Sequence, residues 1–331
     1  MSELVSILIP AYNAEKWIFK TVRSALDQTW PQKEIIIVDD GSKDNTLQIA
    51  RGFESKQVKV VSQRNQGACG ARNTAYKFAQ GEYIQWLDAD DILYPTKIST
   101  QLYGADCGQQ STILRTSAFG TFYYRHSRAK FKPNSLWKNM KPVEWISTKF
   151  NENVWMNPTS WLVSRKLTEM AGPWDERLSI DDDGEYICRV VSKCDGVHFS
   201  PESKCYYRVG NLGSLSQTAS KSLGPLLLSL SLSIKHLLAL EDSPRTREAC
   251  VNYLKFWYPL FYKGNSGLQK NICDLAIALG GNLATPEWGW KYSLIDKAFG
   301  WNFTKKVVYE YRKSKLLLVK NFDRFLYEIK M

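Results

Sequence analysis

Short apolar runs alternate with amphipathic segments through the first hundred residues of the chain. Four runs have the length of strands that are buried on both faces: residues 5–10, 34–38, 58–61 and 82–87. Three segments between them place apolar side chains at helical spacing: residues 17–26, 44–51 and 67–79. Asn13 stands where a cap of the first helix is expected. Strands that alternate with helices are typical of βαβ units, so the pattern predicts an α/β fold with a mostly parallel sheet flanked by helices.

After residue 105 the pattern changes. Residues 112–124 are predicted to form a strand among tryptophan-rich loops, and short helices are expected near 165–171 and 184–192. Leucines within 226–234 alternate with a period of two, which also fits a strand. The spacing nevertheless favours helices in four segments of a C-terminal extension: residues 223–240, 246–262, 268–279 and 305–329.

The charge of the chain is strongly positive and unevenly placed. Lys and Arg number 44 against 33 Asp and Glu, a formal charge of +11, which indicates an anionic partner. Residues 1–105 hold twelve basic and twelve acidic residues, whereas residues 291–331 hold ten against four. A neutral N-terminal third argues against nucleic acid as the partner. Residues 305–329 are predicted to form a basic amphipathic helix, which either lies on an anionic membrane or packs its apolar face on the enzyme body.

Composition also bears on the compartment. Residues 1–4 show neither a basic nor a long apolar region, so no secretory signal is predicted. The leucine-rich run at 222–234 is too short to span a bilayer. The seven cysteines lack paired spacing and are predicted to be reduced. We expect a cytoplasmic protein; in the alternative in which the basic tail lies on a membrane, it would contact the inner face.

Acidic residues follow two of the predicted strands. Asp39 and Asp40 follow the second strand, and Asp88, Asp90 and Asp91 follow the fourth. Ligands of open parallel sheets bind at the carboxyl ends of the strands, where these residues are expected. The second group suits a hard cation such as Mg²⁺ or Mn²⁺, and the first suits the donors of a base or ribose. The alternative is that these residues are helix caps and turn formers.

A third acidic cluster lies at residues 179–185. Asp182 and Asp183 are candidates for a general base, and Glu185 and Arg189 stand one helical turn apart, where they can shape a site. Acidic residues in a first helical turn also simply favour the helix dipole. Arg72 lies near the start of the helix at 67–79, where a phosphate can bind.

Four segments in this order resemble a family-2 glycosyltransferase: Val5–Asn13, Val38–Ser42, Gly70–Asn73 and Leu87–Asp91. Weaker likeness continues through 172–176 and 182–185. The resemblance implies a GT-A fold and transfer of one sugar, with inversion, from a nucleotide diphosphate donor, expected to be UDP-linked. Residues 1–105 would then bind the nucleotide sugar, 106–215 the acceptor, and 216–331 would form the helical extension.

The resemblance also implies roles for single residues. Asp40 would bind the uracil edge, and Pro10, Ala11 and Tyr12 would line the base pocket. The D-x-D motif becomes Asp88-Ala89-Asp90.

In that motif, Asp90 would hold the divalent cation, and Asp88 would hold the ribose or the metal. The acidic pattern that carries the base in this family appears here as Asp182-Asp183-Gly184-Glu185. We predict Asp183 as the base, with Asp182 as the alternative.

The acceptor is less defined by the sequence. Trp174 is the expected acceptor or sugar contact, ahead of Trp155 and Trp161, although most aromatic residues are expected in the core. The Gln-x-x-Arg-Trp motif of processive synthases is absent, which favours transfer of a single sugar to a hydroxyl of a glycan or lipid-linked acceptor. A nucleotidyltransferase is the competing hypothesis, but residues 10–13 do not form the Gly-rich phosphate loop that such enzymes usually need.

Overall fold

The computed structural model describes residues 3–103, 112–210 and 223–329. The N-terminal part alternates strands and helices, as predicted, in this order: β1 Val5–Ala11, α1 Ile18–Leu26, β2 Lys33–Asp39, α2 Thr46–Arg51, β3 Val58–Ser62, α3 Gly67–Phe78 and β4 Tyr83–Trp86. The strands are parallel in the spatial order β3-β2-β1-β4. The apolar runs of β1 and β2 are almost wholly buried because helices cover both faces of a parallel sheet.

The second half of the sheet makes it mixed. Its elements are β5 Ile92–Leu93, α4 Lys97–Leu102, β6 Ile113–Phe122, β7 Lys130–Phe131, α5 Pro142–Glu152, β8 Trp161–Ser164, α6 Arg165–Ala171, α7 Asp182–Val191 and β9 Gly196–Arg208, with short 3-10 turns at 126–128 and 158–160. β8 is antiparallel to both β4 and β6, and β9 is parallel to β6. Because β8 pairs with β4, the sheet continues across residue 105, and the functional division at that point stays a prediction.

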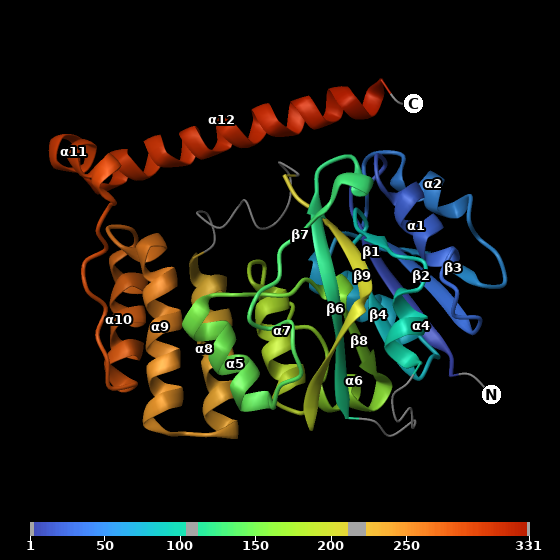
Figure 1. The fold of residues 1–331 in the computed structure, drawn as a ribbon, viewed down its shortest axis with the longest axis horizontal. Helices are drawn as coiled ribbons and strands as arrows, with labels where there is room; N and C mark the ends of the chain where they lie inside the picture. Colours follow the sequence, from blue (N-terminus) through green and yellow to red (C-terminus); the bar gives the residue numbers. More distant parts are fainter. Residues whose placement is uncertain (1–2, 104–111, 211–222, 330–331) are drawn as a thin grey trace.

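The C-terminal region is helical, as predicted. Its helices are α8 Leu223–Leu240, α9 Pro244–Phe261, α10 Ser266–Ala278, α11 Trp290–Phe299 and α12 Trp301–Glu328. Figure 1 shows α8, α9 and α10 beside the sheet, and α12 running back from α11 toward the sheet end of the molecule.

Helix α8 has the predicted bounds, 223–240, so it extends beyond the leucine-rich run at 222–234 that was judged too short to span a bilayer. Its 18 residues, with a mean hydropathy of 1.6, are long and apolar enough to cross a membrane by length and composition. In the structure Leu226, Leu230 and Leu237 are fully buried in the core. Side chains of α8 also bond to α7, as described below, so α8 is a helix packed within this protein.

Two local predictions have different outcomes. Asn13 does not cap α1: its backbone φ is 49°, and its Oδ1 accepts a hydrogen bond from the Lys43 amide. Asn13 therefore ties the end of β1 to the loop after β2. Six cysteines of the described residues are free thiols, as predicted, and Cys107 lies outside the described residues.

Candidate active site

The structure brings the second and third acidic clusters together through one arginine. Arg72 of α3 donates from one terminal nitrogen to Asp88 (2.9 Å) and from the other to Asp182 (2.7 Å). Burial alone would lower its pKa, but Asp88 and Asp182 raise it, so the guanidinium stays charged. The ring of Trp174 lies 4.3 Å from the guanidinium carbon. Arg72 thus joins the loop after β4 to the start of α7, and its contact with the donor stays a prediction.

Asp183 lies in the first turn of α7, beside this ion-pair network. The Gly184 amide donates to its Oδ1 at 2.9 Å. Burial and the nearby Asp182 and Asp181 carboxylates raise the pKa of Asp183 to about 7. A carboxylate with that pKa can accept a proton near neutral pH. Asp182, by contrast, is held by Arg72, so the geometry favours Asp183 over Asp182 as the base.

Asp90 and Asp91 have different surroundings. Asp91 is fully buried and accepts hydrogen bonds from Thr159 Oγ1 (2.6 Å) and the Arg208 amide (2.9 Å). Burial, followed by the charges of Asp90 and Asp88, raises its pKa. Asp91 therefore connects the loop after β4 to β9. Asp90 is half-buried, and its carbonyl accepts a hydrogen bond from Arg208 Nε (2.8 Å).

Tyr207 is a site residue that the sequence did not single out. Burial raises the pKa of this tyrosine, and the charges of Asp91, Asp183 and Asp88 raise it further. Tyr207, on β9, is therefore close enough to these carboxylates to feel their charge. The half-exposed ring of Trp155 packs edge-on against the Tyr207 ring, with centroids 5.3 Å apart. This contact joins Trp155 to Tyr207.

The carboxylate of Asp40 is largely occupied within the protein. It accepts hydrogen bonds from Gln63 Nε2 (2.7 Å) and from the amides of Gln66 (2.8 Å) and Gly67 (2.9 Å). Asp40 therefore caps the start of α3 and occupies the amides that were expected to be open to a phosphate. Two carboxylate oxygens accept about four hydrogen bonds, so one position is left for a base.

Asp39 offers a second acceptor beside Asp40. Its Oδ2 accepts a hydrogen bond from the Ser42 amide (3.3 Å), whereas its buried Oδ1 has no hydrogen-bond partner among the described residues. A buried carboxylate oxygen without a donor is costly, and such an atom is expected to find one in a ligand or water. The cluster reasoning left both carboxylates open to a base or ribose, and the family resemblance singled out Asp40; the buried Asp39 oxygen was not visible from the motif.

The predicted base-pocket residues end β1 beside these carboxylates. The Asp40 amide donates to the Ala11 carbonyl at 2.8 Å, which holds the two strand ends together. Ala11 is buried and Pro10 is half-buried, but 47% of Tyr12 is exposed. The exposed ring of Tyr12 is therefore placed to stack on a planar group bound at this edge.

Trp174 occupies a buried position, which corrects its assignment as a direct sugar contact. Only 2% of Trp174 is exposed. Its ring stacks on Tyr186 with centroids 3.9 Å apart and packs edge-on against Trp86. Trp161 is fully buried as well. Trp174 shapes the site by supporting Arg72, and the exposed Trp155 is the better candidate for an acceptor contact.

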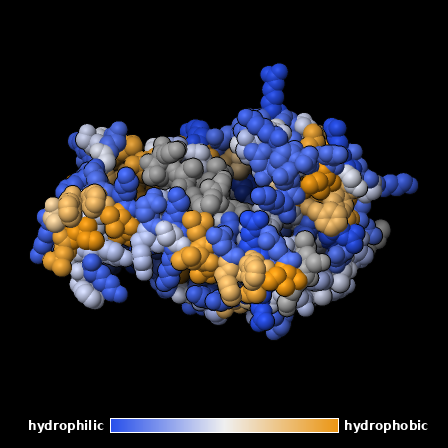
Figure 2. All heavy atoms as spheres, turned by 90° about the horizontal axis from the view of Figure 1, so that it is seen from above, coloured by the Kyte–Doolittle hydropathy of each residue, from blue (hydrophilic) through white to orange (hydrophobic). Residues whose placement is uncertain are grey.

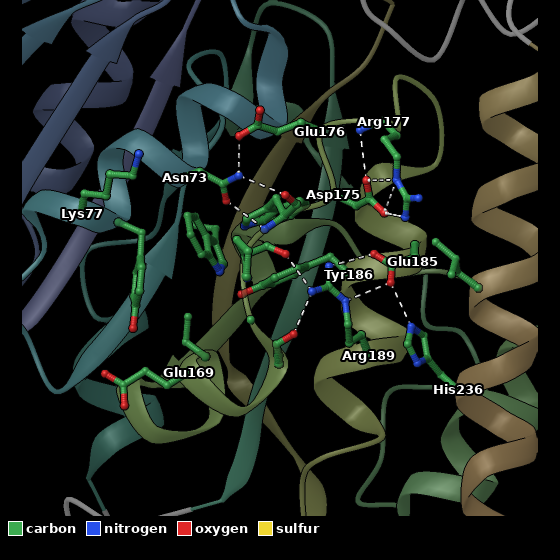
Figure 3. Close-up of a pocket in the computed structure, with 18 residues that line it drawn as sticks. Asn73, Lys77, Glu169, Asp175, Glu176, Arg177, Glu185, Tyr186, Arg189 and His236 are labelled. Atoms are coloured by element: carbon green, nitrogen blue, oxygen red, sulfur yellow. Dashed lines mark hydrogen bonds and ion pairs between the residues drawn. The ribbon is translucent and has the colours of Figure 1, made fainter.

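Glu185 and Arg189 line a cavity of about 940 Å³. The Arg189 side chain donates to both Glu185 oxygens (2.9 and 3.0 Å) and to the carbonyls of Ala171 and Pro173 (each 2.7 Å). His236 of α8 contacts Glu185 Oε1 at 2.9 Å, and Figure 3 shows Arg189 and His236 converging on Glu185. Asp88, Asp90 and Asp183 do not line this cavity. Glu185 and Arg189 therefore fix the turn before Trp174.

Helices α8 and α9 hold the residue that starts α7. Asp181 has a left-handed backbone (φ 54°), and its Oδ2 accepts hydrogen bonds from Ser229 Oγ (2.9 Å) and Tyr253 OH (3.1 Å). Asp181 directly precedes Asp182 and Asp183. The C-terminal helices thereby position the acidic turn. The sequence did not predict these two hydrogen bonds, because Ser229 and Tyr253 lie 48 and 72 residues from Asp181.

This contact predicts a positioning role for Tyr253. We expect Tyr253→Phe to lower kcat severalfold with little change in UDP affinity, because Asp181 loses one of its two donors. The hydrogen bond from Tyr253 lowers the pKa of Asp181, so its loss makes Asp181 more often neutral and weakens its effect on the pKa of Asp183. The rising limb of the pH–rate profile should then move to lower pH. Tyr103→Phe, on an exposed ring, is the control; equal profiles for both variants would exclude the role.

The carboxylates at this edge fit a divalent cation that a substrate helps to hold. The described residues contain no group of three His, Cys, Asp or Glu side chains placed to hold a metal. Asp88 already binds Arg72, so the protein offers chiefly the Asp90 carboxylate. Mg²⁺ commonly binds through one or two carboxylates and completes its coordination with substrate phosphates and water. The donor chemistry therefore suits Mg²⁺ or Mn²⁺ in the presence of a diphosphate.

Comparison with known proteins assigns the N-terminal half of the chain. Residues 6–167, just under half of the chain, match the family model described as glycosyl transferase family 2. This confirms the resemblance predicted from the four ordered motifs. The acidic turn at 181–183 lies beyond the matched residues, although the fold brings it to them through Arg72.

Two relatives align with this glycosyltransferase domain. The chain is 47% identical over 102 residues to the UDP-Glc:alpha-D-GlcNAc-diphosphoundecaprenol beta-1,3-glucosyltransferase WfaP of Escherichia coli, covering 30% of this chain and 41% of the relative. It is 34% identical over 179 residues to the glycosyltransferase GlyG of Streptococcus pneumoniae, covering 50% of this chain and 58% of the relative. The chain thus aligns with less than two thirds of either relative.

A solved structure is similar over most of the chain. The S. aureus TarS structure in complex with UDP-GlcNAc has a TM-score of 0.66 and 19% identity, and it covers 83% of this chain and 81% of that one. At this identity the likeness concerns the fold. It confirms the predicted GT-A-type architecture of a sheet flanked by helices with a helical C-terminal region, although the sheet is mixed where the sequence predicted a mostly parallel one.

Proposed function

We propose that this protein transfers one sugar, with inversion, from a UDP-linked donor to a hydroxyl acceptor. The observation that carries the proposal is the position of Asp183. Its turn is joined through Asp182 and Arg72 to Asp88 of the D-x-D motif. A candidate base and a candidate donor site therefore share one edge of the sheet, where the family-2 domain is expected to act.

The chemistry follows from the placement of these groups. Tyr12 and the Asp39–Asp40 pair receive the base, and Arg72 keeps Asp88 and the Asp183 turn at a fixed separation. The Asp183 carboxylate takes the proton of the acceptor hydroxyl as its oxygen attacks the anomeric carbon from the face opposite the diphosphate. A divalent cation held by Asp90, with Asp88 beside it, would offset the negative charge that develops on the leaving diphosphate.

The acceptor is proposed from the relatives. The name of WfaP describes an acceptor sugar on diphosphoundecaprenol. We extend this class to the present chain and propose a lipid-linked sugar, used at the cytoplasmic face of the membrane. Trp155 is the proposed aromatic contact for that sugar, because its exposed ring adjoins Tyr207.

The pH dependence of the reaction tests the proposed base. Asp183 has a pKa of about 7 and acts only when deprotonated, so kcat/KM should rise from pH 6 to pH 8 and then level off. Initial rates with a saturating metal concentration measure this profile. A flat profile across that range would exclude a base with this pKa.

Ligand-dependent melting separates the proposal from its alternatives. We expect UDP with Mn²⁺ to raise the melting temperature of the full chain, and UDP with EDTA to raise it much less. Nucleoside triphosphates with sugar 1-phosphates test the nucleotidyltransferase hypothesis, and duplex DNA tests nucleic-acid binding. Stabilisation by DNA alone would contradict the proposed function.

A further inference from the structure

Helix α12 is fixed to the rest of the protein at both of its ends. Near its start, the ring of Trp301 packs against Trp288 and Tyr262, with centroids 4.6 and 5.1 Å away. Near its end, Asp323 accepts hydrogen bonds from Arg125 Nε (2.7 Å) and the Tyr124 amide (2.9 Å). These contacts determine which face of the helix points away from the protein.

The outward face carries a continuous row of apolar side chains, which we call the outer stripe. Successive members are seven, four, three and four residues apart, so they share one face of the helix. Between 59% and 73% of each is exposed. The outer stripe consists of Tyr311, Leu318, Phe322, Phe325 and Ile329. Exposed rows of this kind mark surfaces that bind a protein or a membrane.

The apolar surface continues onto α11. Trp290 and Leu294 stand one turn apart on that helix, and 80% and 75% of them are exposed. Figure 2 shows apolar side chains gathered over α11 and α12, with hydrophilic side chains between them. Two consecutive helices therefore present apolar groups that the described chain does not cover.

Charge identifies the occupant of this surface. Residues 291–331 contain ten basic and four acidic residues. Three of the four acidic groups, Glu310, Asp323 and Glu328, already pair with basic side chains. A second copy of the same basic surface would repel the first, whereas an anionic lipid bilayer attracts it. Apolar groups combined with excess positive charge are the pattern of helices that lie in the membrane interface.

The same helix contacts the candidate active site. Lys320 Nζ donates to the Gly210 carbonyl at 2.7 Å. Two residues earlier, Arg208 donates to the Asp90 carbonyl and lies over the Trp17 ring, 3.9 Å from its centroid. The outer stripe is therefore carried by an element that adjoins the chain segment holding the D-x-D loop.

We propose that the outer stripe and the exposed apolar residues of α11 dock this protein on an anionic bilayer, next to its lipid-linked acceptor. The nature of that acceptor rests on the proposed function, whereas the docking itself does not. Apolar side chains enter the interface, and the flanking basic side chains meet lipid headgroups. The active site then works at the membrane surface while the helix remains bound to the domain through Asp323 and Trp301.

Vesicle co-sedimentation of the full chain tests the proposal. We expect binding to vesicles of phosphatidylglycerol and phosphatidylcholine, and at least about tenfold weaker binding to phosphatidylcholine alone. The variant Leu318→Ser/Phe322→Ser/Phe325→Ser should lose about tenfold in binding to the anionic vesicles. Phe256→Ser, an exposed residue of α9, is the matched control and should bind like the wild type.

Two further measurements interpret the result. Circular dichroism melting checks that the triple variant is folded, and Leu318→Ser alone replaces it if it is not. The triple variant should release UDP from a UDP-sugar at the wild-type rate in buffer without vesicles. If the wild type releases no UDP, the proposed function is refuted, but the vesicle-binding result still tests the docking proposal. Equal vesicle binding by wild type and variant overturns the docking proposal. The docking proposal is also overturned if light scattering shows that the wild type is a dimer, the triple variant is a monomer, and neither protein binds vesicles.

Discussion

Asp183→Asn is expected to abolish sugar transfer while leaving UDP binding in place. The amide keeps the shape of the side chain but cannot take the acceptor proton, so the rate should fall by about 10²- to 10⁴-fold. The affinity for UDP and metal should change less than about threefold, because the donor contacts proposed here come from other residues. Transfer assays and calorimetric titration with UDP measure the two effects. Asp274→Asn, on the surface of α10, is the control.

The variant Asp183→Asn should also differ from the wild type in how its stability depends on pH. The folded protein raises the pKa of Asp183 from 3.8 to about 7, so its ionisation opposes folding, and the wild type loses stability as the pH rises through this range. Asp183→Asn has no such charge. At pH 8 it should be more stable than the wild type by up to about 4 kcal/mol, because the shift is about three pKa units, and at pH 4 the difference should nearly vanish. An unchanged melting temperature at both pH values would mean that Asp183 is not held in this electrostatic environment.

Asp90→Ala is expected to remove metal-dependent donor binding. With its half-buried carboxylate gone, the affinity for UDP in the presence of Mn²⁺ should fall by about 10- to 100-fold, to the level of the wild type in EDTA. The fold should persist, because the hydrogen bonds from Thr159 to Asp91 and from Arg208 to the Asp90 carbonyl remain in the variant. Titration of wild type and variant with and without Mn²⁺ gives the comparison. If Asp90→Ala binds UDP with an undiminished response to Mn²⁺, the cation is held elsewhere.

The periodicity of the sequence was sufficient to predict the N-terminal parallel strands and most helices. The strands β1 to β4 are apolar because they are buried on both faces, so each can be recognised from its own short run of sequence. Helix α5 was missed, although Pro142 at its start and Trp145, Ile146 and Phe150 on its buried face carry a helical signal. The pairing of β8 with β4 could not be predicted, because it depends on contacts between residues about 80 positions apart.

The candidate site was predictable only in part. The motifs placed Asp88, Asp90 and Asp183 in a plausible order, but the bridge through Arg72 requires the folded geometry. Trp174 was expected to contact the acceptor or a sugar because it lies beside an acidic loop, yet its ring is buried against Arg72. The support of Asp181 by Ser229 and Tyr253 comes from helices that show no motif. Such contacts are set by packing across the domain.

The basic C-terminal residues predicted as an amphipathic helix lie on α12 in the structure. The sequence left two alternatives open for this helix, packing on the enzyme body or lying on a membrane. The structure shows the packing, through Trp301 and Asp323, while the membrane contact of the outer stripe stays our proposal. Packing orients the helix, and the exposed face remains available for a membrane.

The central claim is that this protein transfers sugars from a UDP-linked donor at the carboxylate edge of its sheet. Release of UDP from a panel of UDP-sugars, measured for the purified full chain with Mn²⁺, tests it most directly. We predict release from at least one UDP-sugar, its loss in EDTA, and no comparable release of the nucleoside diphosphate from GDP- or ADP-sugars. An absence of nucleotide release from every donor, with a folded protein and metal present, would contradict the account.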